Sequence, residues 1–130
     1  MNYIVSDLII QLKNASLARR KQVTLPYSRL SKDILQVLIK QGFVASVKEQ
    51  VEKGKKTLVT MIAYEKRMPV MNDVTVLSKP SLRKYAKATD SVHLKGRGLG
   101  ILVVSTSKGV MTGKEAFQKG VGGELLFKIW

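Results

Sequence analysis

Residues 98–130 read GLGILVVSTSKGVMTGKEAFQKGVGGELLFKIW, and this stretch decides the fold of the carboxyl-terminal half. The apolar run Ile101–Ser105 predicts a buried strand. Thr112 is followed three residues later by a glutamate, which is the spacing of a capping box, and it predicts a short helix that ends at Gly120. Glu124–Trp130 predicts the closing strand. A strand, a surface turn, a short helix and a last strand therefore follow one another.

The surface turn carries a run of small polar residues, Ser105, Thr106, Ser107, Lys108 and Gly109. Hydroxyls donate and accept hydrogen bonds, a lysine can meet a phosphate, and a glycine lets a partner approach the backbone. An ordinary strand-to-helix loop, in which hydroxyls satisfy nearby backbone groups, has the same composition. From these residues alone, a recognition surface and a structural loop both remain open.

The charge of the chain points to a polyanionic partner. Of 130 residues, 23 are basic and 9 acidic, which gives a net charge of +14. Residues 1–66 hold 12 basic and 5 acidic residues, and residues 67–130 hold 11 and 4, so each half carries +7. An even spread predicts a folded body with positive surface on several sides rather than a detachable basic tail. A hydrophobic content of 45% is enough to build its core.

Other features of the composition exclude whole classes of site. The chain has no cysteine, which excludes disulfides and thiolate metal sites, and we expect no metal and no cofactor. The segment Met1–Asp7 lacks the basic start of a secretory signal, and no run approaches the roughly 20 apolar residues of a membrane span. We therefore expect a soluble, cytoplasmic protein without membrane contact.

The amino-terminal half alternates helices and strands. Apolar spacing predicts a helix over Ile4–Leu17, and Ser28 can cap a second helix that runs to about Gln41. The alternating segment Gln22–Leu25 lies between these helices. The two alternating runs after the second helix predict a hairpin with its turn at Lys53–Lys55. The expected order is α-β-α-β-β.

Arg67–Asn72 is the best boundary candidate, because Pro69 interrupts the pattern there. We expect an α/β domain over 1–66 and a β-rich domain over 67–130 that carries the polar turn. The second domain adds strands at Val74–Leu77 and Leu82–Ala86. The predicted fold class is α+β, with the α-β-α-β-β half packed against a mostly β half that has one short helix.

Further candidate residues flank the polar turn in sequence. Gly122 and Gly123 predict either a β-bulge or backbone brought close to another group. Beside them, Glu124 can accept from the amino group of a base or orient a neighbouring lysine. Tyr85 lies among cations and is either a packed strand residue or a stacking platform for a base or sugar.

The remaining candidates are cationic or lie in the first helix. Lys79 and Arg83 are possible phosphate contacts if the same face is used. Asn14 precedes the cations Arg19–Lys21 at the end of the first helix, where a solvated helix terminus and an RNA contact remain equally open.

Two groups of residues are similar to the catalytic residues of enzymes. Ser105 and Lys108 have the Ser-x-x-Lys spacing of penicillin-recognising acyl transferases, but that motif belongs at a helix start with further partner motifs. Asp90 and His93 do not complete a catalytic triad, because no nucleophile elbow is present. We expect no enzyme, and the acyl-enzyme stays a remote alternative.

Three motifs resemble a known family. The run Ser105–Thr112, the later Gly120–Glu124 and the terminal Trp130 closely resemble the carboxyl-terminal signature of the bacterial-type small-subunit ribosomal protein eight. The similarity extends to Ser78–Tyr85 and to Asn14-Ala15, and it covers essentially the whole chain. The chain departs from the family in its first helix, where Leu8 replaces a proline and Gln11 and Lys13 replace arginines.

The resemblance implies a structural constituent of the small ribosomal subunit that binds a stem in the central domain of the rRNA and supports assembly. It implies that 67–130 is the RNA-binding domain and that the polar turn lies in the shallow minor groove of that stem. Implied further partners are neighbouring small-subunit proteins and a similar stem in the messenger RNA of its own operon. The implied state is a monomer outside the ribosome, with the ribosome in the cytoplasm or in an organellar matrix or stroma. A general basic RNA chaperone without a preferred site is the alternative.

Overall fold

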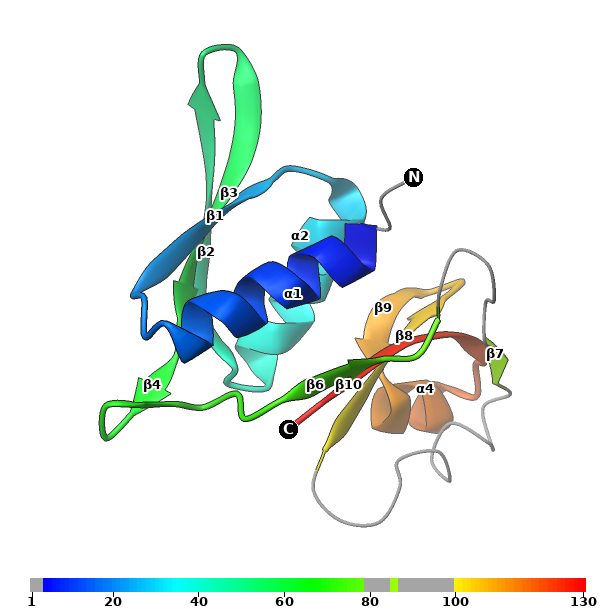
Figure 1. Ribbon diagram of the computed structural model, residues 1–130. Helices are drawn as coiled ribbons and strands as arrows, with labels where there is room; N and C mark the ends of the chain where they lie inside the picture. Colours follow the sequence, from blue (N-terminus) through cyan, green and yellow to red (C-terminus); the bar gives the residue numbers. More distant parts are fainter. Residues whose placement is uncertain (1–3, 79–84, 87–99) are drawn as a thin grey trace.

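The computed structural model describes residues 4–78, 85–86 and 100–130 (Figure 1). The amino-terminal half confirms the predicted order α-β-α-β-β. Its elements are α1 (Ile4–Leu17), β1 (Gln22–Pro26), α2 (Arg29–Lys40), β2 (Val44–Glu52) and β3 (Lys55–Ile62).

Both helices form where apolar spacing and capping predict them. On α1, Leu8, Ile9 and Leu12 recur at helical spacing and are buried. The N-cap of α2 is Ser28, whose hydroxyl oxygen accepts a hydrogen bond from the Ser31 backbone N–H at 3.0 Å. The helix stops before Gly42, which has a φ of +85°.

The strands of this half form an antiparallel sheet in the order β1-β3-β2. The turn between β2 and β3 consists of Lys53 and Gly54, with φ values of +51° and +76°. Positive φ at both positions is the geometry of a two-residue type I′ hairpin turn. Figure 1 shows this hairpin projecting well beyond the helices.

The carboxyl-terminal half is mostly β with one short helix, which confirms the α+β class. Its described elements are β4 (Tyr64–Glu65), β5 (Met68–Pro69), β6 (Val74–Val76), β7 (Tyr85–Ala86), β8 (Ile101–Thr106), β9 (Gly109–Thr112), α4 (Gly113–Lys119) and β10 (Gly123–Ile129). Four strands form an antiparallel sheet in the order β6-β10-β8-β9, and β7 also pairs with β10. Two features go beyond the predicted pattern: the β4–β5 hairpin near the expected boundary, and β9.

The predicted N-cap of α4, Thr112, is present. The Thr112 hydroxyl oxygen accepts from the Glu115 backbone N–H at 3.2 Å, and Gly120 ends the helix with a φ of +69°. One face of the sheet packs under this helix, around Val104, Met111 and Leu125.

One apolar cluster joins the two halves of the chain. Ile9 and Leu35 from the first half pack in the same buried cluster as Val103, Phe127 and Ile129 from the second. This shared core couples the folding of the two segments. The division into separate domains over 1–66 and 67–130 stays a prediction.

An ion pair fastens α1 to the start of β6. Lys13 Nζ lies 2.8 Å from Asp73 Oδ1, and Asp73 also accepts from the Val74 backbone N–H at 2.8 Å. The pKa of Asp73 is lowered mainly by its hydrogen bond with Lys13 and, to a smaller extent, by the hydrogen bond from the Val74 N–H. The ion pair therefore stabilises the fold at pH values above the ordinary pKa of a carboxyl group, and this stabilisation is lost as the pH falls through the lowered pKa of Asp73.

Among the described helices, none is long and apolar enough to cross a membrane.

Truncating the shared core should destabilise both halves together. Phe127 is fully buried, so Phe127→Ala should lower the free energy of unfolding by about 3–5 kcal/mol. Urea unfolding should be followed by the fluorescence of Trp130, the one tryptophan of the chain, and by far-ultraviolet circular dichroism. We expect coincident transitions.

Phe117, which is 48% exposed, supplies the control, and Phe117→Ala should cost roughly 1 kcal/mol or less. Two separated transitions in the parent protein would show that the halves fold independently and would contradict a shared core.

Candidate nucleic-acid interface

Strand register brings three of the predicted residues into one row. On β10, Glu124 lies directly opposite Ser105 of β8 on one side and Tyr85 of β7 on the other. Paired residues of antiparallel strands point to the same face, and neighbouring strands lie roughly 4.8 Å apart. We call this set, Tyr85, Glu124 and Ser105, the polar row. Tyr85 is 71% exposed, while Glu124 and Ser105 are half-buried.

The polar turn is the connection of a β-hairpin. Ser107 and Lys108 join β8 to β9 and are both exposed. The Thr106 hydroxyl donates to the Gly109 carbonyl at 2.8 Å and accepts from the Lys108 backbone N–H at 3.1 Å. Gly109 has a φ of +112°. Of the three hydroxyls, that of Thr106 therefore stabilises the turn, and that of Ser107 is presented to solvent.

Position 123 requires glycine because the backbone of β10 lies very close to the backbone of β8 there. A Cβ atom at this position would lie 2.1 Å from the Ser105 carbonyl oxygen. The irregularity in the pairing of β8 and β10 lies further along, between Leu125 and Phe127. Of the two interpretations of this glycine, the structure supports backbone proximity, and the group it approaches belongs to the polar turn itself.

The amino-terminal end of α2 lies beside the same hairpin. Arg29, Leu30 and Asp33 line a shallow groove of about 560 Å³ together with residues 105–110. Sequence reasoning missed Arg29, because no local pattern reports which strand a helix end will touch. Residues from both halves of the chain line the groove, because α2 packs against β9.

The other predicted residues are placed as follows. Gly122 is exposed and immediately precedes β10. Asn14 is exposed in the last turn of α1 and is not part of the row or of the groove. Lys79 and Arg83 lie outside the described residues.

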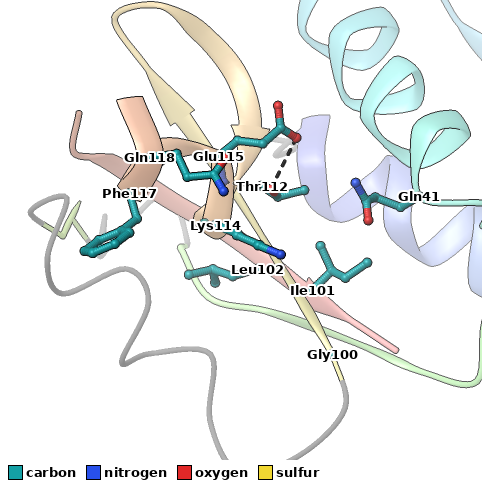
Figure 2. A pocket seen from close by; sticks show the side chains of 10 residues that line it. Gln41, Gly100, Ile101, Leu102, Thr112, Lys114, Glu115, Phe117 and Gln118 are labelled. Carbon is teal, nitrogen blue, oxygen red and sulfur yellow. Dashed lines mark hydrogen bonds between the residues drawn. The ribbon is translucent and has the colours of Figure 1, made fainter. Parts of the chain in front are cut away.

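A second hollow, of about 770 Å³, lies between α4, the start of β8 and the end of α2 (Figure 2). Its ionisable lining groups are Lys114 and Glu115, and the Glu115 carboxylate accepts a hydrogen bond from the Thr112 hydroxyl at 3.2 Å. None of the predicted site residues lines it. Across the described part of the chain, no group of three or more metal-ligating side chains occurs either.

The comparisons with known proteins decide the family. The family model described as ribosomal protein S8 matches residues 3–130. The chain belongs to the ribosomal protein S8 family. Among similar relatives is the small ribosomal subunit protein uS8 of Dictyoglomus thermophilum, 39% identical over 97% of this chain and 95% of the relative. The protein of the same name from an Arthrobacter species is 42% identical over 97% and 96%. That from Thermosynechococcus vestitus is 37% identical over 100% and 98%.

The S8 family is one of ribosomal proteins, and the structure adds a geometric argument against the acyl-enzyme. Ser105 is the last residue but one of β8 and Lys108 lies in the hairpin turn that follows, whereas a Ser-x-x-Lys nucleophile belongs at the start of a helix.

Adding a side chain at Gly123 should distort the β8–β9 hairpin of this S8 chain. Gly123→Ala should lower the free energy of unfolding by about 1–3 kcal/mol, because its methyl group meets backbone atoms that cannot move aside as a flexible side chain would. The matched control is Gly122→Ala, at an exposed position just outside the strand, which should change stability by about 0.5 kcal/mol or less. Equal losses in the two variants, measured by urea denaturation, would contradict the close approach.

Proposed function

We propose that this chain is a non-catalytic structural constituent of the small ribosomal subunit that binds directly to an irregular stem in the central domain of the rRNA. The observation that carries the proposal is the strand register, which sets Tyr85, Glu124 and Ser105 in one row beside the Ser107-Lys108 turn. Membership in the ribosomal protein S8 family and the names of the relatives support it.

The chemistry of this surface suits a shallow RNA minor groove. That groove presents 2′-hydroxyls, sugar oxygens and base edges, which small polar side chains can reach together. The exposed Ser107 hydroxyl can exchange hydrogen bonds with a 2′-hydroxyl, and the exposed Tyr85 ring offers a stacking face for a base or sugar. Glu124 repels phosphates, so its place in the row favours acceptance from an exocyclic amino group.

Cations supply affinity without sequence information. The charge of +14 attracts any RNA, and each phosphate contact releases counterions and makes binding depend on salt. Lys108 in the turn and Arg29 of α2 both line the groove, where they can position the RNA backbone. Specificity then depends on the hydroxyls and the carboxylate.

Binding an irregular stem would also support assembly of the subunit. Binding lowers the conformational freedom of the RNA nearby, so later proteins meet a platform that is already ordered. A similar stem in the messenger RNA of its own operon would be bound by the same surface and would repress translation. Neighbouring small-subunit proteins are the further partners.

Removing the serine hydroxyl should cost specificity. Ser107→Ala should weaken binding to the cognate stem by about 1–3 kcal/mol and leave random duplex unaffected, because the lost contact reads the shape of one stem. Filter binding or calorimetry with both RNAs measures the difference. Equal losses on both RNAs, or no preference of the parent protein over bulk transfer RNA, would instead indicate a general RNA chaperone.

Removing the lysine charge should cost affinity for every RNA. Lys108→Ala should weaken cognate and random duplexes alike and flatten the dependence of log K on log salt by about 0.7–0.9. A titration series in potassium chloride gives the slope. A loss restricted to the cognate stem would show that Lys108 reads a base edge, contrary to a phosphate contact.

A further inference from the structure

The polar row lies on the face of its sheet that packs against the helices of the amino-terminal half. Side chains alternate between the two faces of a strand, so Ser105 points to the same face as Val103. Val103 packs in one buried cluster with Leu35 of α2, whereas Val104 packs in the other cluster, under α4. Glu124 lies opposite Ser105 and shares this face. The row is therefore on the same side of the sheet as α2.

The groove beside the β8–β9 turn connects this row to α2. Val110 of β9 lies opposite Ser105, and it packs against the same buried cluster. Arg29, Leu30 and Asp33 of α2 line the groove together with Val110. Because Leu30 packs against the core, the side of α2 that borders the groove is fixed. A ligand that lies across this surface meets side chains from both halves of the chain.

Asp33 is a half-buried carboxylate in this groove. It belongs to none of the ion pairs found in the described part of the chain. The neighbouring Lys32 pairs instead with Glu49, at 2.8 Å, and Arg29 lies one helical turn before Asp33 without forming an ion pair with it. A carboxylate that has lost part of its hydration and has no partner in the protein is stabilised by a ligand that donates a hydrogen bond.

The stability of α2 does not account for this aspartate. A carboxylate interacts favourably with the helix dipole mainly in the first turn, and Asp33 is the fifth residue of α2, which begins at Arg29. An acid four residues after a base is also the less favourable order for a pair of charges on a helix. An acid in a groove that Arg29 and Lys108 also line, without a gain for the helix, points to a functional constraint.

A carboxylate selects for a group that donates a hydrogen bond. The ionised group is an acceptor only, and it repels phosphates. The donors in the minor groove of an RNA stem are the 2′-hydroxyl of every nucleotide and the 2-amino group of guanine. A 2′-hydroxyl both donates and accepts, so the serine hydroxyls of the turn already suit it, whereas the amino group only donates. The guanine amino group is therefore the best match for Asp33.

We propose that Asp33 is a specificity-determining residue that accepts a hydrogen bond from the 2-amino group of a guanine in the minor groove of the bound stem. This inference rests on the proposed function, because it adds a contact to the same RNA. Glu124 lies on β10 and Asp33 beside β9, with β8 between these strands, which are therefore about 10 Å apart. The two carboxylates contact different nucleotides, and each half of the chain contributes to recognition.

Replacing Asp33 should change the affinities for cognate and random RNA in opposite directions. Asp33→Ala should weaken binding to the cognate stem roughly tenfold, because a charged acceptor is lost. The same variant should bind random duplex up to about twofold more tightly, because one negative charge no longer repels the phosphates. Filter binding with both RNAs measures the two effects, and the urea midpoint reports whether the fold is intact.

The matched control is Glu52→Ala, which removes an exposed acid from the end of β2, away from the groove. It should tighten binding to both RNAs to the same small extent. Weaker binding of both RNAs by Asp33→Ala, or behaviour that equals that of Glu52→Ala, would overturn the proposal.

Inosine substitution locates the donor on the RNA. Inosine lacks the 2-amino group of guanosine, so each guanosine of the stem is replaced in turn. At one position, we expect inosine to weaken binding of the parent protein roughly tenfold and to leave Asp33→Ala within about twofold. An aspartate with a purely structural role would show no such coupling. Coupling to a 2′-deoxy substitution instead of inosine, or no coupling at any position, would overturn the guanine contact.

The Ser107→Ala variant separates this inference from the proposed function. If Ser107→Ala loses affinity for the cognate stem alone while Asp33→Ala behaves like Glu52→Ala, the stem-binding site stands and the role of Asp33 is refuted. If Ser107→Ala loses equally on both RNAs, the proposed function fails, and the contact of Asp33 fails with it.

Discussion

The candidate interface depends on how closely β10 approaches β8. Gly123 has no side chain, and a Cβ atom there would lie 2.1 Å from the Ser105 carbonyl oxygen, so only glycine allows the two strands to meet at this point. That approach keeps the next residue, Glu124, in register with Ser105 and with Tyr85. A single backbone constraint therefore positions three side chains that are distant in sequence and gives them a common face.

A second constraint ties this face to the rest of the molecule. Val103 and Phe127 lie on the sheet that carries the polar row, yet they pack in one cluster with Ile9 and Leu35 of the helices. This core holds the amino-terminal end of α2 beside the β8–β9 hairpin, so Arg29 borders the same groove as Ser107. The interface is thus a property of the whole fold, and core packing sets its geometry.

Local signals in the sequence were enough to predict much of this structure. Apolar spacing and the caps at Ser28 and Thr112 predicted both long helices and α4, because these signals act within a few residues. The short strands β4, β5 and β9 were not predicted, since their pairing depends on partners and carries little local pattern. The polar turn was predicted from its composition and its resemblance to the family, whereas the row required the register of β7 and β8 against β10, which no single segment encodes. Arg29 was missed for the same reason.

The most direct test of the central claim is an amide-resolved NMR titration of the isotopically labelled chain with the isolated rRNA stem. The account predicts that the largest changes in amide chemical shift fall on Ser105–Gly109, Tyr85 and Glu124, while the turn at Lys53 and Gly54 is unaffected. Large changes confined to other surfaces, with the polar row and its turn unchanged at saturating RNA, would contradict it.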